Sequence, residues 1–331
     1  MVERLDAFMA RANAAYYATK NPFADFTTAP EISQVFGELL GLWAAVAWQT
    51  MGAPAPVILA EAGPGRGTMM ADALRAIART APAFGQALRL HLVETSPGLR
   101  AAQAQKLPGA AWHDRIADLP EGPLLLLANE FLDALPIRQF VFRDGWRERF
   151  VADGRFVEIA VAPPSPHPPS ARGGGALDDG TIVECPEAAI ALVTHLAARI
   201  AATGGAALFL DYGPEHSAPG DSLQALRDGR PADPLAAPGS ADLTAHVDFA
   251  RLAAAARAAG AAVFGPVPQG LFLARLGLFQ RTGMLARQNP ARAGALQAAA
   301  ARLAEPDRMG RLFKAMAVCH PALPPPAGFV A

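Results

Sequence analysis

The sequence is poor in cysteine and in charge, and each shortage excludes a class of protein. Cys185 and Cys319 are its only cysteines, too few for a disulfide-stapled scaffold or a multi-thiolate metal site, and they suit a reducing compartment. Charged residues make up 18% of the chain, below the roughly 25% of an average globular protein. The 29 Lys and Arg residues balance the 30 Asp and Glu residues, so a broad basic face for nucleic acid is not expected.

The sequence also lacks a long apolar segment. No run of 18 uncharged apolar residues occurs, so no transmembrane helix is predicted. Glu3 and Asp6 lie in the N-terminal segment, which is therefore not typical of a secretory signal. Its apolar residues recur at helical spacing, at positions 5, 8, 9 and 12, and predict an amphipathic helix. Together these features favour a cytoplasmic protein.

Apolar segments alternate with helical patterns and predict an α/β fold, with ample core material in the 52% of hydrophobic residues. The runs VILAE (57–61) and LLLLA (124–128) do not alternate polar and apolar residues, which is typical of strands covered on both faces of a parallel sheet. Further strands are predicted within residues 88–96, 110–120, 204–213 and 312–320, and helices over 31–51, 69–80, from 97 onward, 186–203 and 248–259.

Residues 138–160 have a different pattern, in which polar and apolar residues alternate. Asp144-Gly145 and Asp153-Gly154 are typical hairpin turns, so a small antiparallel insertion is predicted there. Residues 161–180 are rich in Pro, Ser and Gly and predict a loop. The polar residues 213–245 predict an irregular functional loop. The hairpins and the loop at 161–180 could dock a protein partner or another copy of the chain.

A glycine-rich turn follows the first predicted strand of this sheet. Glu61, Gly63, Gly65 and Gly67 form the pattern E-x-G-x-G-x-G, and a helix begins near Thr68. Glycines let the backbone turn sharply and let a ligand approach it closely. The order of strand, turn and helix predicts a site for a nucleotide-type cofactor, either a dinucleotide or S-adenosylmethionine. A tight turn without a ligand is the alternative.

Three residues of the turn favour S-adenosylmethionine. The dinucleotide fingerprint G-x-G-x-x-G requires a glycine where Thr68 stands. Pro64 removes an amide and Glu61 adds a negative charge, whereas a pyrophosphate needs free amides and no nearby anion. S-adenosylmethionine instead carries a sulfonium and an ammonium group, which a carboxylate attracts. An NAD-dependent oxidoreductase is therefore disfavoured.

The next two strands supply further candidate contacts to this cofactor. Glu94 and Thr95 end the second strand, 27 residues (94 minus 67) after the last glycine. A carboxylate there can accept hydrogen bonds from both hydroxyls of a ribose. Trp112, His113, Asp114 and Arg115 fall where adenine would lie. The alternatives are a solvated Glu94 at a helix start, and a core tryptophan beside surface polar residues.

Seven sequence blocks carry a resemblance to a known family: DFTTAPEISQVFGELLG (25–41), EAGPGRGTMMADALR (61–75), LVETSPGLRAAQ (92–103), NEFLDALPIRQF (129–140), LDYG (210–213), DLTAHVDF (242–249) and QGLFLARLG (269–277). With these blocks the sequence resembles the MidA-like family, which includes an arginine-methylating assembly factor of respiratory complex I. The resemblance implies a class I S-adenosylmethionine-dependent methyltransferase that releases S-adenosylhomocysteine. It also implies a protein-arginine acceptor in a complex I subunit or its bacterial counterpart.

The resemblance further implies a domain organisation. A Rossmann-like, mostly parallel sheet with an antiparallel last strand would be divided between two segments. Residues 53–137 would bind the cofactor, and residues 186–331 would add helical insertions on the acceptor side. Residues 1–52 would form an N-terminal helical lid, and residues 138–185 the antiparallel insertion and loop.

Polar residues after the fourth strand are candidates for the acceptor site. A guanidinium stays protonated in water, with a pKa above about 12, so carboxylates must orient it and receive its proton. Glu130 and Asp133 are predicted to bind it, and Asn129 to orient it and contact the cofactor. His246 could accept the proton because its ordinary pKa is near neutral. The alternatives are a helix cap at Asp133, a surface position for Glu130 and a structural His246, while Asp248 is interpreted as an N-cap.

Polar residues before the first long helix resemble a cofactor-facing lid. Thr28 and Ser33 are the predicted cofactor contacts among them. Capping of the helix start by Thr27 or Thr28 is the alternative, and the two roles are compatible.

Two other functions stay open on the sequence. The acceptor could be a small molecule, or the chain could be an assembly chaperone that binds a subunit without catalysis. The spacing of His, Cys and Asp predicts no metal site, and neither a P-loop nor a G-x-S-x-G motif occurs.

Overall fold

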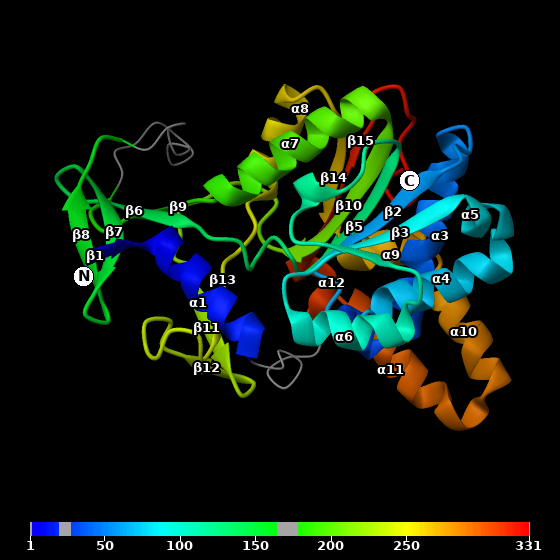
Figure 1. Ribbon diagram of the computed structural model, residues 1–331. Helices are drawn as coiled ribbons and strands as arrows, with labels where there is room; N and C mark the ends of the chain where they lie inside the picture. The colour runs from blue at the N-terminus through cyan, green and yellow to red at the C-terminus, as the bar shows by residue number, and fades with distance from the viewer. Residues whose placement is uncertain (1, 20–27, 164–177, 331) are drawn as a thin grey trace. The chain divides into compact units, whose positions relative to one another are not determined.

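The computed structural model describes residues 2–19, 28–163 and 178–330 (Figure 1). The chain forms two compact units, each drawn from three stretches of sequence. Unit 1 comprises Met1–Phe26, Leu132–Leu192 and Pro214–Leu252, and unit 2 comprises Thr27–Phe131, Val193–Gly213 and Ala253–Ala331. Each unit has a hydrophobic core of its own.

Unit 2 is built on a seven-stranded sheet in the order β14-β15-β10-β5-β2-β3-β4. The strands are β2 (Val57–Ala62), β3 (Leu88–Val93), β4 (Ala111–His113), β5 (Leu124–Asn129), β10 (Gly205–Tyr212), β14 (Ala262–Pro268) and β15 (Phe313–Cys319). β15 pairs antiparallel with both neighbours, whereas the other pairs are parallel. The predicted mostly parallel sheet with an antiparallel last strand is therefore confirmed. β2 and β5 are buried along their whole length, which explains their continuous apolar sequences.

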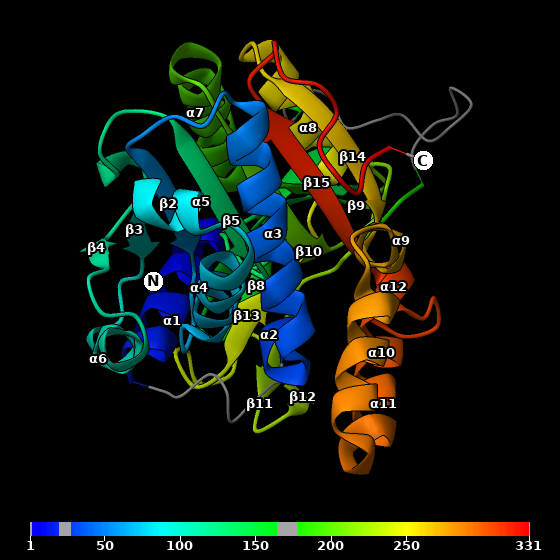
Figure 2. The ribbon, with the colours of Figure 1, turned by 90° about the vertical axis from the view of Figure 1, so that its right-hand side faces the viewer.

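Helices cover both faces of this sheet (Figure 2). On one face, α3 (Gln34–Thr50) and α4 (Thr68–Thr80) pack against alternate strand residues such as Leu125 and Leu127. The part of α7 (Glu187–Thr203) that belongs to unit 2 lies on the opposite face and buries Leu196 and Ile200. The other helices of this unit are α2 (Ala29–Ile32), α5 (Pro82–Ala87), α6 (Pro97–Lys106), α9 (Gln269–Arg275), α10 (Leu278–Gln288), α11 (Ala293–Ala304) and α12 (Met309–Leu312).

The helix predicted over residues 31–51 is interrupted. α2 ends at Ile32, and Ser33 begins α3 by accepting a hydrogen bond from the Val35 amide at 3.2 Å. Further along α3, Gly41 lets α4 approach closely, since an added Cβ would lie 2.7 Å from Ala73 Cα. α3 and α4, the helix that follows the glycine turn, thus pack closely together in one hydrophobic core.

Unit 1 contains an antiparallel sheet of five strands. They are β1 (Val2–Arg4), β6 (Arg138–Phe142), β7 (Trp146–Ala152), β8 (Arg155–Ala160) and β9 (Ile182–Cys185). β6 pairs with β7 and β7 with β8, so both predicted hairpins are confirmed. Asp153 and Gly154 have φ values of 50° and 72°, which the tight second turn requires. β1, which pairs with β7, was not predicted.

A second small sheet of unit 1 corrects a prediction. Residues 213–245 were expected to be irregular, but they contain β11 (Gln224–Arg227), β12 (Arg230–Ala232) and β13 (Asp242–Thr244). The hairpin turn between β11 and β12 has Asp228 and Gly229 at φ 52° and 71°. α1 (Leu5–Thr19) packs on this sheet, and Asn13 bonds to the backbone of Leu243 through both ends of its amide, at 2.8 and 3.0 Å.

The prediction for Asp248 is confirmed by the structure. Asp248 is the N-cap of α8 (Phe249–Ala258), since its Oδ1 accepts a hydrogen bond from the Arg251 amide at 3.0 Å. Cys185 and Cys319 are buried free thiols. The loop predicted at 161–180 falls mostly on residues 164–177, which lie outside the described residues. In the described part of the chain, no helix is both long and apolar enough to cross a membrane.

Candidate cofactor and acceptor site

The glycine turn leaves β2 and leads into α4 with a backbone that only glycine adopts easily. Gly63, Gly65 and Gly67 have φ values of 66°, 53° and 72°. A Cβ on Gly67 would also lie 3.0 Å from Leu107 Cδ1. The left-handed backbone requires glycine at all three positions, and close packing requires it again at Gly67. Such a turn lets a ligand approach the backbone closely.

Glu61 is the penultimate residue of β2, just before this turn, and one of its buried oxygens has no partner among the described residues. The residue is 3% exposed, and its Oε2 accepts no hydrogen bond from any described residue. Burial raises the pKa of its carboxyl to about 8. A buried acceptor of this kind is completed by a positively charged or hydrogen-bond-donating ligand.

Glu94 lies at the end of β3 and is held by its own neighbours. Its Oε1 accepts a hydrogen bond from the Ser96 amide at 2.8 Å, and its Oε2 one from Gln103 Nε2 at 3.3 Å. Burial raises its pKa, and these two bonds oppose that rise. Glu94 is only 9% exposed, so the alternative of a solvated helix-start residue is wrong, while Thr95 beside it is exposed.

Gln103 was missed by the sequence reasoning, although it ends one of the blocks quoted for the resemblance. It lies on α6, is fully buried, and bonds to Gly65, Glu94 and Trp112. Nothing in the sequence pattern distinguishes Gln103 from the other polar residues of α6, and only its burial reveals it.

The residues predicted beside adenine have protein partners in this structure. His113 Nε2 lies 2.9 Å from His91 Nδ1. The pKa of His91 is lowered, mainly by burial and then by the neighbouring His113. Asp114 is exposed and pairs with Arg100 at 2.7 Å. Trp112 packs at the edge of the core. Contact between these residues and a cofactor stays a prediction.

Asn129 and Glu130 end β5 and form a second partly satisfied group. Glu130 has a left-handed φ of 49°, which is uncommon for a residue with a side chain. Its Oε1 accepts hydrogen bonds from the Ala29 amide at 3.2 Å and from Asn129 Nδ2 at 3.1 Å. Burial first, and then the charge of Asp211, raise the pKa of Glu130 to about 7. The buried Asn129 Oδ1 has no hydrogen-bond partner among the described residues.

Glu130 is partly buried, so the alternative of a surface position is wrong. Asp211 is the penultimate residue of β10, lies beside it in the sheet and is 1% exposed. Its two oxygens accept hydrogen bonds from the Phe131 amide at 3.1 Å and the Tyr212 amide at 2.9 Å. Adjacent strand ends therefore bring two carboxylates together in unit 2.

The lid residues form contacts over the start of α4. Thr68 Oγ1 donates to Glu31 Oε1 at 2.7 Å and accepts from Lys106 Nζ at 3.1 Å, so one hydroxyl joins α2, α4 and α6. Ser33 caps α3, whereas Thr28 stands at the N-cap of α2 without a capping hydrogen bond from its side chain to a described residue. Thr27, the other proposed cap, lies outside the described residues.

Asp133 and His246 belong to unit 1, whereas Glu130 belongs to unit 2. The Asp133 carbonyl accepts a hydrogen bond from the Ala245 amide at 2.9 Å, next to His246. His246 is exposed, and its amide donates to Ser222 Oγ at 2.9 Å. The alternative of a helix cap at Asp133 is wrong, because turns lead from it directly to β6.

Known proteins resemble this chain over most of its length. Residues 39–267 match the profile of a family described as S-adenosyl-L-methionine-dependent methyltransferases. The chain is 35% identical to the mitochondrial protein arginine methyltransferase NDUFAF7 homolog of Drosophila melanogaster, over 96% of this chain and 80% of that protein. It is 34% identical to mitochondrial protein arginine methyltransferase NDUFAF7 of Homo sapiens, over 89% of this chain and 73% of that protein.

A solved structure is similar over the whole chain. It is a COG1565 superfamily member from Burkholderia thailandensis bound to S-adenosyl-homocysteine, with a TM-score of 0.82 and 28% identity. The alignment covers 100% of this chain and 90% of that one.

Proposed function

This chain belongs to the family of S-adenosyl-L-methionine-dependent methyltransferases, and from that premise we propose that it methylates an arginine side chain of a protein. The relatives named as protein arginine methyltransferases support the acceptor, since they are 34–36% identical over 87–96% of this chain. As the protein substrate we propose a subunit of respiratory complex I, of the 49-kDa type, or its bacterial counterpart. The cytoplasmic location stays a prediction, and the relatives are named as mitochondrial proteins.

The polar atoms left over in unit 2 fit the cofactor. Glu61 Oε2 and Asn129 Oδ1 are buried acceptors that await a donor, and the ammonium group of S-adenosylmethionine is one. Glu94 would accept hydrogen bonds from the ribose hydroxyls. When bound, the cofactor supplies a methyl group on a positively charged sulfur.

The carboxylate of Glu130 is the observation that carries the arginine assignment. A protonated guanidinium must be oriented and must lose a proton when one of its nitrogens is methylated. Both hydrogen bonds of Glu130 reach Oε1, so its Oε2 is the oxygen that would face the substrate. A pKa of about 7 lets this carboxyl exchange a proton near neutral pH. Asp211 beside it keeps the local charge negative.

Glu130→Gln tests this assignment because it keeps the shape and removes the base. We expect methyl transfer to the purified complex I subunit to fall about 100-fold or more, with the affinity for S-adenosylhomocysteine within threefold of wild type. Glu305→Gln, a change at an exposed glutamate of the same unit, is the matched control and should leave both unchanged. Mass spectrometry of the product locates the methyl group.

Each other outcome selects a different function. Methyl transfer to a small molecule but not to the protein would favour the small-molecule alternative. Cofactor binding without turnover on either acceptor would favour an assembly chaperone. Normal turnover of Glu130→Gln would remove Glu130 from the mechanism and move the role to Asp133 or His246, which we retain as proposed acceptor-side residues.

A further inference from the structure

Gln103 connects three segments that face the proposed cofactor site. We propose that it is a positioning residue, whose amide holds the Glu94 carboxylate against the glycine turn and thereby sets the affinity for the ribose hydroxyls. This inference rests on the proposed function only in placing the ribose at Glu94.

The side chain of Gln103 is fully buried, and all its polar atoms are engaged. Its Nε2 donates to the Gly65 carbonyl at 2.7 Å and to Glu94 Oε2 at 3.3 Å. Its Oε1 accepts a hydrogen bond from Trp112 Nε1 at 2.8 Å. One amide therefore joins the glycine turn, the end of β3 and the strand β4.

The chemistry of the partners determines how this amide is oriented. The Gly65 carbonyl and the Glu94 carboxylate can only accept, and the Trp112 indole can only donate. A flipped amide would lose all three hydrogen bonds, so the orientation follows from the network itself. Ionised glutamate has the same shape but no proton to donate, and methionine has the same length but no donor at all.

The side chain of Gln103 lies beside the glycine turn. Its Cγ lies 3.5 Å from the position that a Cβ on Gly67 would occupy. If Gln103 could not donate, Glu94 would keep backbone hydrogen bonds from Thr95 and Ser96, but its Oε2 would lose the side-chain donor that ties the carboxylate to α6 and the glycine turn. A carboxylate without that tie loses the alignment that two neighbouring hydroxyls require.

Calorimetry on the purified full chain tests the inference with two probes, S-adenosylhomocysteine and its 2′-deoxy analogue. In the wild type we expect the missing hydroxyl to weaken binding about 10-fold. In Gln103→Met we expect S-adenosylhomocysteine to bind about 10-fold more weakly and the analogue to be nearly unchanged, so that the discrimination disappears. A merely structural defect would weaken both probes by the same factor.

Two further variants keep the test decisive. Glu305→Gln, the exposed control of the same unit, should keep the wild-type discrimination. Gln103→Glu has the shape of the wild type, and loss of discrimination there supports the inference even if Gln103→Met does not fold. Wild-type discrimination in a folded Gln103 variant would overturn the role of Gln103 alone. If the wild type binds S-adenosylhomocysteine and its 2′-deoxy analogue equally tightly, both the role of Gln103 and the ribose role of Glu94 are overturned. If it does not bind S-adenosylhomocysteine, the proposed function itself is contradicted.

Discussion

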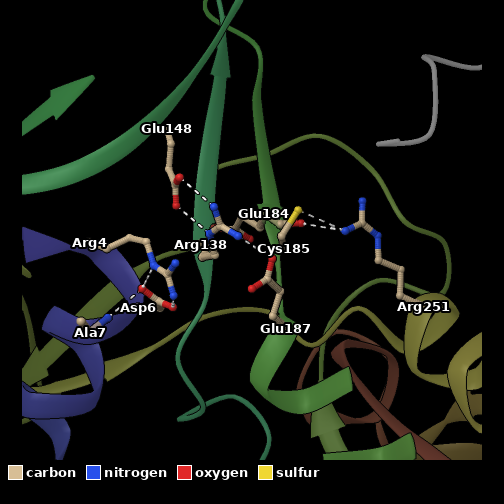
Figure 3. Close-up of polar contacts among 9 residues, drawn as sticks. All are labelled: Arg4, Asp6, Ala7, Arg138, Glu148, Glu184, Cys185, Glu187 and Arg251. Carbon is tan, nitrogen blue, oxygen red and sulfur yellow. Dashed lines mark hydrogen bonds and ion pairs between the residues drawn. The ribbon is translucent and has the colours of Figure 1, made fainter. Parts of the chain in front are cut away.

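The antiparallel sheet of unit 1 and the glycine turn of unit 2 each bury a glutamate, and the two are satisfied in opposite ways. Glu148 and Glu61 are both 3% exposed. Glu148 receives two hydrogen bonds from Arg138, at 2.6 and 2.7 Å (Figure 3). Glu61 has an oxygen without a partner among the described residues and a pKa raised to about 8. The two glutamates are therefore equally buried, but Glu148 is paired with Arg138 and Glu61 has one oxygen without a partner among the described residues.

The difference separates a structural carboxylate from one that awaits a ligand. Arg138 also pairs with Glu187, and Arg4 pairs with Asp6, so the charges around β6 neutralise one another within unit 1 (Figure 3). At the strand ends of unit 2, by contrast, Glu61 and Asn129 have buried oxygens left over. Unpaired buried acceptors cluster at ligand sites because only the ligand offsets their desolvation.

Breaking the closed pair should produce the largest effect on stability. Arg138→Met leaves Glu148 buried and unpaired, and we expect the free energy of unfolding to fall by about 3 kcal/mol. Urea unfolding followed by circular dichroism measures the loss. The double variant Arg138→Met/Glu148→Leu removes both charges and should regain most of the stability. If the double variant is as unstable as the single one, the loss comes from packing and the unpaired charge is not its cause.

Replacing Glu61, whose Oε2 has no partner among the described residues, should instead raise the free energy of unfolding. The folded pKa of Glu61, about 8, lies above its ordinary value of 4.5. The folded state therefore keeps a proton that the unfolded state releases above about pH 4.5. Binding of this proton stabilises the folded state, and that stabilisation is lost as the pH rises through 8. We expect ligand-free Glu61→Gln to be more stable than wild type at pH 8 by about 1 to 3 kcal/mol, and the difference to shrink at pH 5. Thermal unfolding across this pH range measures it.

The same variant should lose affinity for S-adenosylhomocysteine by about 10-fold or more, because the ammonium group of the ligand favours the ionised form of Glu61 and a neutral amide cannot supply that charge. Glu130, with its pKa raised to about 7, contributes a pH dependence of the same sign that Glu61→Gln retains. A variant that binds the cofactor product normally and unfolds with the wild-type pH dependence would remove Glu61 from the comparison.

The sheet of unit 2 was predictable because its central strands are buried on both faces. β2 and β5 therefore stand out as apolar runs, and Glu61 and Glu130 follow as the polar residues at their ends. The break at Ser33 was missed because the apolar spacing continues through it on both sides. β1 was missed because three residues carry no pattern, and β7, with which it pairs, is far along the chain.

Contacts between distant side chains set the limit of the sequence reasoning. The Asp228-Gly229 turn carries the same signal as Asp144-Gly145 and should have been recognised. The bond from Gln103 to Gly65, in contrast, joins residues 38 apart. The pairing of Arg138 with Glu148 depends on the register of β6 and β7, which no residue type reveals by itself.

The exposed arm of the Arg138 network should matter least. Arg138 Nη1 pairs with Glu187 at 2.7 Å, but Glu187 is 51% exposed, whereas the side chain of Glu148 is 4% exposed. Water already solvates Glu187, so its loss leaves no buried charge without a partner, and we expect Glu187→Gln to change the free energy of unfolding by less than about 1 kcal/mol. Added salt should reduce even that change, since exposed pairs are screened. A loss as large as that of Arg138→Met, measured in the same urea series, would show that Arg138 depends on both partners and that burial does not rank them.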